Sequence, residues 1–582
     1  MSCVGTSGRN LGWRFGLGLT LSLASGLAMP AAAQQQHAHG TAASKPAARL
    51  FEGLGQYHRP IATANPDAQR YFDQGLTLVY GFNHEEAIRS FEEAARLDPA
   101  AAMPHWGIAL ALGENINSPV DPERAARAYA AVQKARELAK AKIPAAAAGG
   151  TGGKGDTPPA DAATVEAAYI EALAVRYSKD PKADPKPLAI AYSEKMKALA
   201  AAYPDDLDAA TLYAESLMNL KPWQLWSLDG TPSEVTLEVV AVLEGVLVKA
   251  PDHPGANHYY IHAVEASNQP ERALPSAARL ETLVPAAGHL VHMPAHIYAR
   301  TGDYKAAADR NAVAAEADRA YIKATGVAEA FYPLMYYTHN LMFLTQASAM
   351  AGRYADALAS AKQTVEHVGP AVKQMPMVEA LTVEPLLVYV RFGKWDEILA
   401  APQPDASHTI ATVQWRYARA CAFAAKGDVA SGEAEVKALA EARTKVTKDQ
   451  MIGLNPAPMV LEIAQFVAAG RVAEAKRNFA GAIGAFTQAV TKQDLLAYDE
   501  PPDFHYPVRE SLGGLWLRAN EAGEAEAVFR KDLTKNRRNG RSLYGLWQAL
   551  MMQKKTAEAE MVRLQYEAAW KNADVQLTVK GL

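Results

Sequence analysis

Histidines are the residues of this sequence whose number and spacing could support chemistry. The chain has 582 residues and 15 histidines, so a window of 39 residues is expected to hold one. The window 258–296 holds five instead. These are His258, His262, His289, His292 and His296.

Four of these histidines form two pairs with helical spacing. His258 and His262 are four residues apart, as are His292 and His296, and the pairs are offset by 34 residues. Residues four apart lie on one face of a helix, so each pair can present two imidazoles to one metal ion. Imidazole donors suit zinc, copper, nickel and iron, and the sequence does not choose among them. We therefore predict a divalent transition-metal ion as the cofactor, held by these four histidines.

Three further residues could join this metal site, namely His289, His339 and Glu265. Glu265 lies about 10.5 Å from His258 along a helix axis, which is too far for both to bind one ion. A carboxylate three residues from His262 could instead accept a hydrogen bond from that imidazole and orient it, or it could bind a second ion, and we favour the orienting role. Pro294 either kinks the helix between His292 and His296 or marks its first turn, and the second case would disturb the pair.

Composition and motifs exclude several other classes of protein. With 59 basic and 63 acidic residues the chain has no positive excess to hold a phosphate backbone, so we expect no nucleic-acid partner. Two cysteines, Cys3 and Cys421, exclude a disulfide scaffold and a thiolate cluster. The sequence has no Ser–His–Asp motif, no phosphate-binding glycine loop and no dinucleotide fingerprint.

The N-terminus has the features of a secretory signal peptide. Arg9 and Arg14 precede the apolar stretch 15–28, and an Ala-x-Ala site ends at Ala33. We expect residues 1–33 to be a signal peptide, cleaved near Ala33, and residues 34–50 to be a disordered tail. No later stretch is long and apolar enough to span a membrane. The mature protein is therefore expected to be exported, either periplasmic or secreted.

Helices must position the histidines, because no segment shows a sustained period-two alternation. Ala- and Leu-rich amphipathic helices are predicted at 166–177, 188–202, 207–220, 415–425 and 459–469. A Gly-, Pro- and Ala-rich flexible loop at 143–160 separates an N-terminal block, 51–142, from a main block, 161–582, with the histidine-rich groove at 255–345. The fold class is all-α.

The helices follow a repeat. Residues between 71 and 99 have the spacing of a 34-residue helix–turn–helix unit, in which Asn83 and Glu86 form a capping box. The matching residues are Tyr71, Gly75, Ala87, Phe91, Ala94 and Pro99. The same register returns around Gly302 and Gly352, and around Gly513 and Phe529 with a shortened turn.

On these positions the sequence resembles the tetratricopeptide repeat (TPR). Residues 81–110, 292–304 and 500–513 are similar to a group of exported bacterial TPR proteins, and the histidine-bearing middle more loosely resembles the tetratricopeptide repeat protein 38 type. The resemblance implies an α-solenoid of stacked antiparallel helix pairs, whose concave groove would be lined by both histidine pairs and by His339. We place four more residues in the same groove, namely His105, Trp106, Met342 and Gln346.

The sequence thus predicts an exported TPR-like binding protein whose concave site takes a divalent transition metal. One alternative is a metal-free scaffold of the cell envelope that docks a protein or peptide in its groove and tolerates loss of the histidines. The other is a metal-dependent hydrolase or oxidase, which requires a deep pocket and a carboxylate or tyrosine within reach of the metal.

Overall fold

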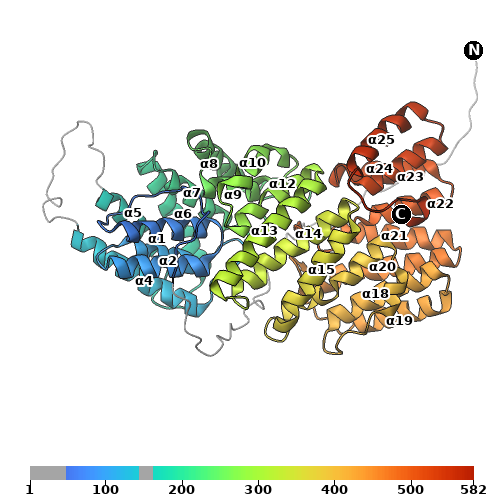
Figure 1. Cartoon of the computed structure of the whole chain (residues 1–582), viewed down its shortest axis with the longest axis horizontal. Coiled ribbons are helices and arrows are strands. Elements are labelled where there is room, and N and C mark those ends of the chain that lie inside the picture. Colours follow the sequence, from blue (N-terminus) through green and yellow to red (C-terminus); the bar gives the residue numbers. More distant parts are fainter. Residues whose placement is uncertain (1–47, 143–161) are drawn as a thin grey trace, which may run out of the picture. The chain divides into compact units, whose positions relative to one another are not determined.

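Stacked antiparallel helix pairs build the protein, as expected for an all-α, TPR-like solenoid (Figure 1). The computed structural model describes residues 48–142 and 162–582. The predicted signal peptide 1–33, most of the predicted tail and the predicted loop 143–160 lie outside these ranges. Residues 48–50, the end of that predicted tail, contact the helices: the Arg49 guanidinium donates to the Ala324 carbonyl, and the Gln74 amide donates to the Arg49 carbonyl.

Longer connections lie at residues 219–235 and 494–507, but most helices in the described ranges follow one another with short connections. The first are α1 (Pro66–Tyr80), α2 (His84–Leu97), α3 (Met103–Leu112), α4 (Pro122–Lys142), α5 (Ala162–Ala174), α6 (Pro185–Ala202), α7 (Leu207–Met218), α8 (Thr236–Lys249) and α9 (Pro254–Val264). The middle ones are η3 (Pro270–Ala273), α10 (Leu274–Leu283), α11 (Gly288–His292), α12 (Pro294–Thr301), α13 (Tyr304–Thr325), the π-helix η4 (Pro333–Tyr337), α14 (Thr338–Met350) and α15 (Tyr354–Val368).

The remaining elements complete the solenoid. They are η5 (Gly369–Ala371), η6 (Pro376–Val383), α16 (Glu384–Phe392), α17 (Trp395–Ala400), α18 (Thr409–Lys426), α19 (Val429–Arg443), α20 (Ala457–Ala475), α21 (Phe479–Gln493), α22 (Val508–Arg518), α23 (Ala522–Lys535), α24 (Gly540–Met552), α25 (Thr556–Ala569) and η7 (Val579–Gly581). A short antiparallel hairpin of β1 (Met451–Ile452) and β2 (Asn455–Pro456) precedes α20. Each of the five helices expected at 166–177, 188–202, 207–220, 415–425 and 459–469 is present as α5, α6, α7, α18 or α20.

Glycines let successive helices pack closely around a phenylalanine. A Cβ added to Gly75 in α1 would lie 2.5 Å from the Phe91 ring of α2, and one added to Gly107 in α3 would lie 2.6 Å from it. The ring is therefore held between two helix backbones, as the repeat spacing predicts. The same arrangement recurs around Phe529, which faces Gly513 and Gly545.

Local capping follows the sequence in part. Asn83 is the N-cap of α2, and its side chain accepts a hydrogen bond from the Glu86 amide. The Glu86 carboxylate does not complete the expected capping box, because it accepts hydrogen bonds from Arg89 and from the Tyr321 hydroxyl instead. The cap thus starts the helix while Glu86 links α2 to α13.

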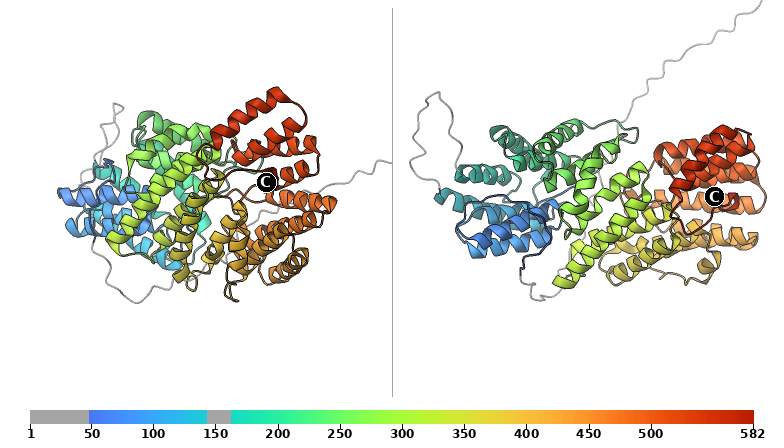
Figure 2. Two further views of the ribbon diagram at one scale, coloured as in Figure 1. Left: turned by 45° about the vertical axis from the view of Figure 1, so that its right-hand side comes forward. Right: turned by 45° about the horizontal axis from the view of Figure 1, so that its top comes forward.

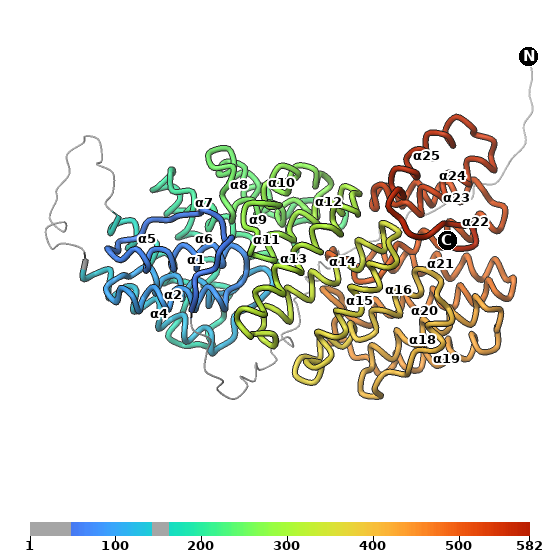
Figure 3. The backbone as a smooth tube through the Cα atoms, in the orientation of Figure 1, coloured from blue at the N-terminus to red at the C-terminus, as the bar shows by residue number. Residues whose placement is uncertain are grey.

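One hydrophobic core joins the helices on both sides of residues 143–161. Buried side chains of α1, α3, α5, α7 and α9 belong to it, among them Phe72, Trp106, Tyr169, Leu212 and Tyr259. Further cores lie in the C-terminal helices, around Phe486 and around Phe529. Figure 3 labels the stretch of the chain from α9 to α14, drawn in green to yellow-green there and in Figure 2. The six histidines of the predicted metal site lie on α9, α11, α12 and α14.

No helix in the described ranges has the length and apolarity needed to cross a membrane.

Candidate metal centre

Two of the helices that carry these histidines, α9 and α11, are buried throughout. Every residue of α9, from Pro254 to Val264, is buried. His253 is the N-cap of this helix, with Nδ1 accepting a hydrogen bond from the Ala256 amide at 3.1 Å. The five histidines between 258 and 296 are at most 6 % exposed. The expectation that these side chains line an open concave groove is therefore wrong. They lie in the interior, between α9, α11, α12 and α14.

Three histidines form the first trio, defined as His258, His262 and His289. Nε2 of His258 lies 3.1 Å from Nε2 of His289. One ring nitrogen from each of the three residues lies within 4.8 Å of those of the other two. The i,i+4 pair of α9 thus meets a third imidazole from α11. His289 is therefore a candidate metal ligand equivalent to His258 and His262.

Three other histidines form the second trio, defined as His292, His296 and His339. Nε2 of His292 lies 2.7 Å from Nε2 of His296 and 3.1 Å from Nε2 of His339. Again one nitrogen from each residue lies within 4.8 Å of the others. The pairs predicted from spacing therefore belong to two neighbouring groups of three, rather than to one group of four.

A helix break at Pro294 leaves the second pair intact. Helix α11 ends at His292 and α12 begins at Pro294, which lacks an N–H and cannot continue the hydrogen-bond ladder. The connecting Met293 keeps helical dihedral angles of φ −51° and ψ −36°. His292 and His296 consequently stay on one side of the chain and meet despite the break.

Glu265 links the two trios. Its Oε1 accepts a hydrogen bond from Nδ1 of His262 at 2.8 Å, and its Oε2 lies 2.6 Å from Nδ1 of His296. The ring centroids of these two histidines are 5.6 Å apart. The orienting contact predicted for Glu265 and His262 is therefore present, and the same carboxylate also holds an imidazole of the second trio.

Two more histidines have their Nδ1 atoms fixed by hydrogen bonds. Nδ1 of His258 donates to the Tyr80 carbonyl at 2.6 Å. Nδ1 of His292 donates to Oδ1 of Asn311 at 2.7 Å. The amide orientation of Asn311 is set by its own donation to the Ala307 carbonyl at 2.8 Å. These carbonyl oxygens only accept, so both imidazoles carry their proton on Nδ1 and present the Nε2 lone pair to their trio.

Electrostatics keep most of these imidazoles neutral. Burial, reinforced by neighbouring imidazoles, lowers the pKa of His258, His289 and His292 well below the usual value and that of His339 to about 3. Burial opposes the charge of Glu265 also, but the facing imidazoles of His296 and His262 outweigh it and hold the carboxyl pKa low. Burial would lower the pKa of His296, yet the Glu265 carboxylate raises it above the usual value. Neutral imidazoles are the form that binds metal.

Aromatic rings enclose the trios. Phe82, in the left-handed region with φ 56°, lies 4.6 Å from the His258 ring and 5.4 Å from the His289 ring, measured between centroids. Phe343 of α14 lies 5.3 Å from the His292 ring. Such walls exclude water and strengthen interactions inside the site.

The prediction that Trp106 lines the groove is wrong. The Trp106 ring is 1 % exposed and packs against Phe72 and Tyr169 in the core. Large aromatic side chains bury much apolar area, which explains this outcome. His105 of α3 and Met342 and Gln346 of α14 are half-buried.

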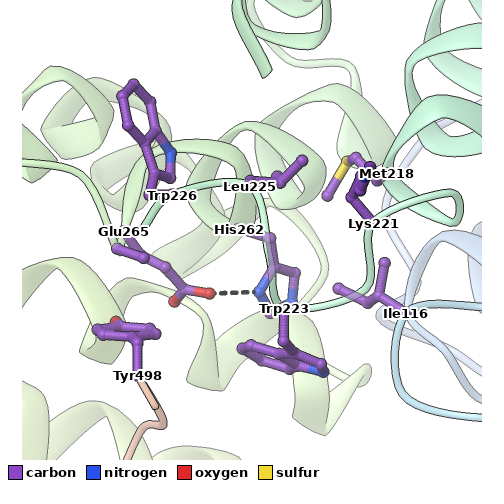
Figure 4. Close-up of a pocket in the computed structure, with 10 residues that line it drawn as sticks. Ile116, Met218, Lys221, Trp223, Leu225, Trp226, His262, Glu265 and Tyr498 are labelled. Atoms are coloured by element: carbon purple, nitrogen blue, oxygen red, sulfur yellow. Dashed lines mark hydrogen bonds and ion pairs between the residues drawn. The ribbon is translucent and has the colours of Figure 1, made fainter. Parts of the chain in front are cut away.

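Sequence reasoning missed three aromatic residues near the first trio. Trp223, Trp226 and Tyr498 line a pocket that also includes His262 and Glu265 (Figure 4). Tyr498 lies more than 230 positions from His262 in the chain, so no local spacing could have indicated it. Trp223 and Trp226 lie in the connection between α7 and α8, where no repeat register applies.

Comparisons with known proteins add only a general likeness. No protein-family model and no curated protein matches the chain. Among solved structures, a human IFIT1 dimer with m7Gppp-AAAA is 12 % identical, with a TM-score of 0.33 and coverage of 88 % of this chain and 92 % of that one. Yeast Tom70 is 12 % identical with a TM-score of 0.28, over 86 % of this chain and 90 % of that one.

A third similar structure is the APC/C hetero-tetramer Cut9–Hcn1, at 11 % identity and a TM-score of 0.28, over 88 % of this chain and 94 % of that one. These identities are too low for a function of any of the three proteins to be assigned to this chain. The finer resemblance to exported bacterial TPR proteins and to the protein 38 type stays a prediction.

Proposed function

We propose that this protein binds two transition-metal ions, one in each histidine trio. The observation that carries the proposal is the approach of Nε2 of His292 to Nε2 of His296 at 2.7 Å. Both residues direct Nδ1 to an oxygen, of Asn311 in one case and of Glu265 in the other.

Two neutral imidazoles that both carry their proton on Nδ1 cannot hydrogen-bond through Nε2. Each then presents a lone pair, and two buried lone pairs at this distance repel each other. Without a cation between them, His296, whose pKa the Glu265 carboxylate raises, would be protonated and donate to His292. The single lone pair of His292 would then have to serve both His296 and His339. A metal ion at the centre of the trio satisfies all three nitrogens at once.

The spacing of the nitrogens supports the same assignment. At a metal–nitrogen distance of about 2.0–2.1 Å, neighbouring ligand nitrogens are about 2.8–3.0 Å apart in octahedral geometry and about 3.3–3.4 Å apart in tetrahedral geometry. The Nε2 separations of 3.1 Å, between His258 and His289 and between His292 and His339, lie between these two values. The 2.7 Å separation needs a small outward movement of His296 or His292.

The surroundings of the trios also fit metal binding. Metal-ligating histidines donate their second ring N–H to a carboxylate or carbonyl, which fixes tautomer and orientation. Four of the six histidines face such an oxygen, provided by Tyr80, Asn311 or both oxygens of Glu265. Imidazole donors suit zinc, copper, nickel and iron.

Burial argues against the docking scaffold as the role of these side chains. The side chains of His258, His292 and His296 are at most 1 % exposed, so a docked peptide could not reach them. A metal ion is small enough to enter through small movements of the surrounding side chains. Once bound, it accepts the lone pairs of the buried imidazole nitrogens.

Elemental analysis tests the proposal. We expect the native protein, purified without chelator or loaded with one of the four metals, to hold two ions per chain. A His258→Ala/His262→Ala variant and a His292→Ala/His296→Ala variant should each retain one. A His367→Ala/His408→Ala variant removes two histidines outside the trios and should retain two. Protein that stays metal-free after challenge with all four metals overturns the proposal.

A further inference from the structure

A pocket leads from the surface to the first trio. Its enclosed free space is about 20 Å³, and the figure rises to about 360 Å³ only when the space open to solvent at its mouth is counted. His262 and Glu265 form part of its wall, together with apolar and aromatic side chains (Figure 4). The apolar members include Ile116, Met218, Leu225 and Ala266, and the aromatic ones are Trp223, Trp226 and Tyr498.

One wall of the pocket is an imidazole that has a buried nitrogen without a hydrogen-bond partner. His262 is 6 % exposed, and its Nε2 has no hydrogen-bond partner, whereas its Nδ1 is held by Glu265. The Trp223 ring packs edge-on against the His262 ring, with centroids 5.6 Å apart. A group that enters the pocket therefore approaches the first trio from the side of His262.

The walls of the pocket are held in place from outside. The Trp226 indole N–H donates to the Ala263 carbonyl at 2.7 Å, which ties the ring to α9. The Arg300 guanidinium lies 5.6 Å from the Tyr498 ring centroid and donates to the Glu265 carbonyl at 2.9 Å. Preorganised walls reduce the ordering cost of binding a ligand.

We propose that this pocket admits a small, neutral molecule that donates one nitrogen or oxygen lone pair to the metal ion of the first trio. The proposal rests on the metal binding proposed above. Three histidine ligands leave a coordination position open, which is the arrangement by which metal sites take up an external ligand. None of the described pocket-lining residues belongs to the second trio, so the exchangeable ligand is assigned to the first ion alone.

The charges around the pocket select for a neutral ligand. The Glu265 carboxylate at the inner end repels an anion. Lys221, also in the lining, is paired with Glu234 at 2.7 Å, so its ammonium is already neutralised. Apolar walls such as Ile116 and Leu225 disfavour any ion, since they offer no hydrogen bonds to replace its hydration.

Imidazole is the probe, because it is small, neutral above pH 8 and a nitrogen donor. In protein loaded with cobalt(II), we expect imidazole to change the visible absorption of one of the two ions with a saturating dependence. Ala266→Phe fills the pocket and should weaken imidazole binding at least ten-fold. Ala557→Phe places the same ring on the exposed face of α25 and should leave the affinity unchanged. Ala266→Leu provides a smaller block should the Phe variant lose an ion.

The outcomes separate this proposal from the metal binding itself. Two bound ions whose spectra do not respond to imidazole, or equal imidazole affinity in the native and Ala266 variants, would overturn the pocket proposal and leave metal binding intact. A chain that binds no cobalt(II), zinc, copper, nickel or iron would overturn the metal binding, and this proposal with it.

Discussion

At the scale of single residues, Glu265 determines how the two trios are related. Its two carboxylate oxygens face Nδ1 of His262 and Nδ1 of His296, one from each trio. A histidine held in this way keeps its Nε2 lone pair directed at the metal, and the negative charge raises the basicity of the imidazole. One side chain therefore serves both sites, although it binds neither ion in the proposed arrangement.

Glu265→Gln should weaken metal binding at both trios about 10- to 100-fold, because an amide lacks the charge and can accept through one atom only. Competition with a chelator of known affinity measures each site. Glu433→Gln, on the exposed surface of α19, is the control and should bind as the native protein does. An affinity that is unchanged, or lowered at one site alone, contradicts this role of Glu265.

Asp532 makes the stability of the protein depend on pH. This side chain is 1 % exposed and accepts hydrogen bonds from Asn536, Asn539 and Ser542. Burial and then the charge of Glu510 raise its pKa from 3.8 to about 6. Between these two values the folded state holds a proton that the unfolded state has lost, so the free energy of unfolding falls as the pH rises through this window.

The native protein should lose about 2 kcal/mol of stability from this group between pH 4 and pH 7. Asp532→Asn cannot ionise and should lack this contribution. Urea unfolding at several pH values gives the free energy of unfolding of both proteins. Between pH 4 and pH 7, the stability of the variant relative to the native protein should rise by the amount that the native protein loses. A difference that stays constant with pH would show that the Asp532 carboxyl is not perturbed.

At the scale of the elements, repeat spacing predicted how the helices meet. Gly75 and Phe91 match the repeat, and the Phe91 ring lies between the backbones of α1 and α3. The α1–α2 contact forms within one unit of the chain, so the sequence pattern contains the information. The histidine pairs were predictable for the same reason, since four-residue spacing on a helix fixes their common face.

Gly75→Ala should destabilise the protein by about 1–3 kcal/mol, because the added methyl group would overlap the Phe91 ring. Gly484→Ala, in α21 with no atom within 4 Å of the added methyl, is the matched control. It should be neutral or stabilise by up to about 1 kcal/mol through helix propensity. Equal urea midpoints for the two variants would contradict the close-packing explanation.

Contacts between distant elements could not be predicted from one sequence. Tyr498 meets the first trio's pocket only because the segment before α22 packs near α9, and Asn311 meets His292 only because α13 packs on α11. The spacing of residues along a helix indicates which side chains share a face of that helix. It does not indicate which distant helix packs against that face. Trp106 was placed in a groove for this reason: its neighbours Phe72 and Tyr169 come from α1 and α5.

At the scale of the whole described chain, the histidines lie where helices from several units meet. The first trio joins α9 to α11, and the second joins α11 and α12 to α14. Each proposed ion therefore cross-links helices that are up to 47 residues apart, as between His292 and His339. An unfolded chain holds no such preformed site, so metal binding adds to the folding free energy.

Metal at 100 times its dissociation constant should raise the free energy of unfolding by about 2.7 kcal/mol per ion. Thermal unfolding with zinc and with excess chelator measures the change. The His258→Ala/His262→Ala variant should show about half of it, since the second trio remains. Unfolding curves that coincide with and without metal would mean that the ions do not bind the folded state at these positions.

X-ray absorption spectroscopy on the zinc-loaded protein tests the central claim most directly, because it counts the imidazole ligands around each ion. The predicted spectrum shows an average of three imidazole nitrogens per zinc at about 2.0–2.1 Å. This average should persist in the His258→Ala/His262→Ala variant, whose one remaining ion lies in the second trio. A shell of oxygen atoms with one imidazole or none would contradict binding by the two histidine trios.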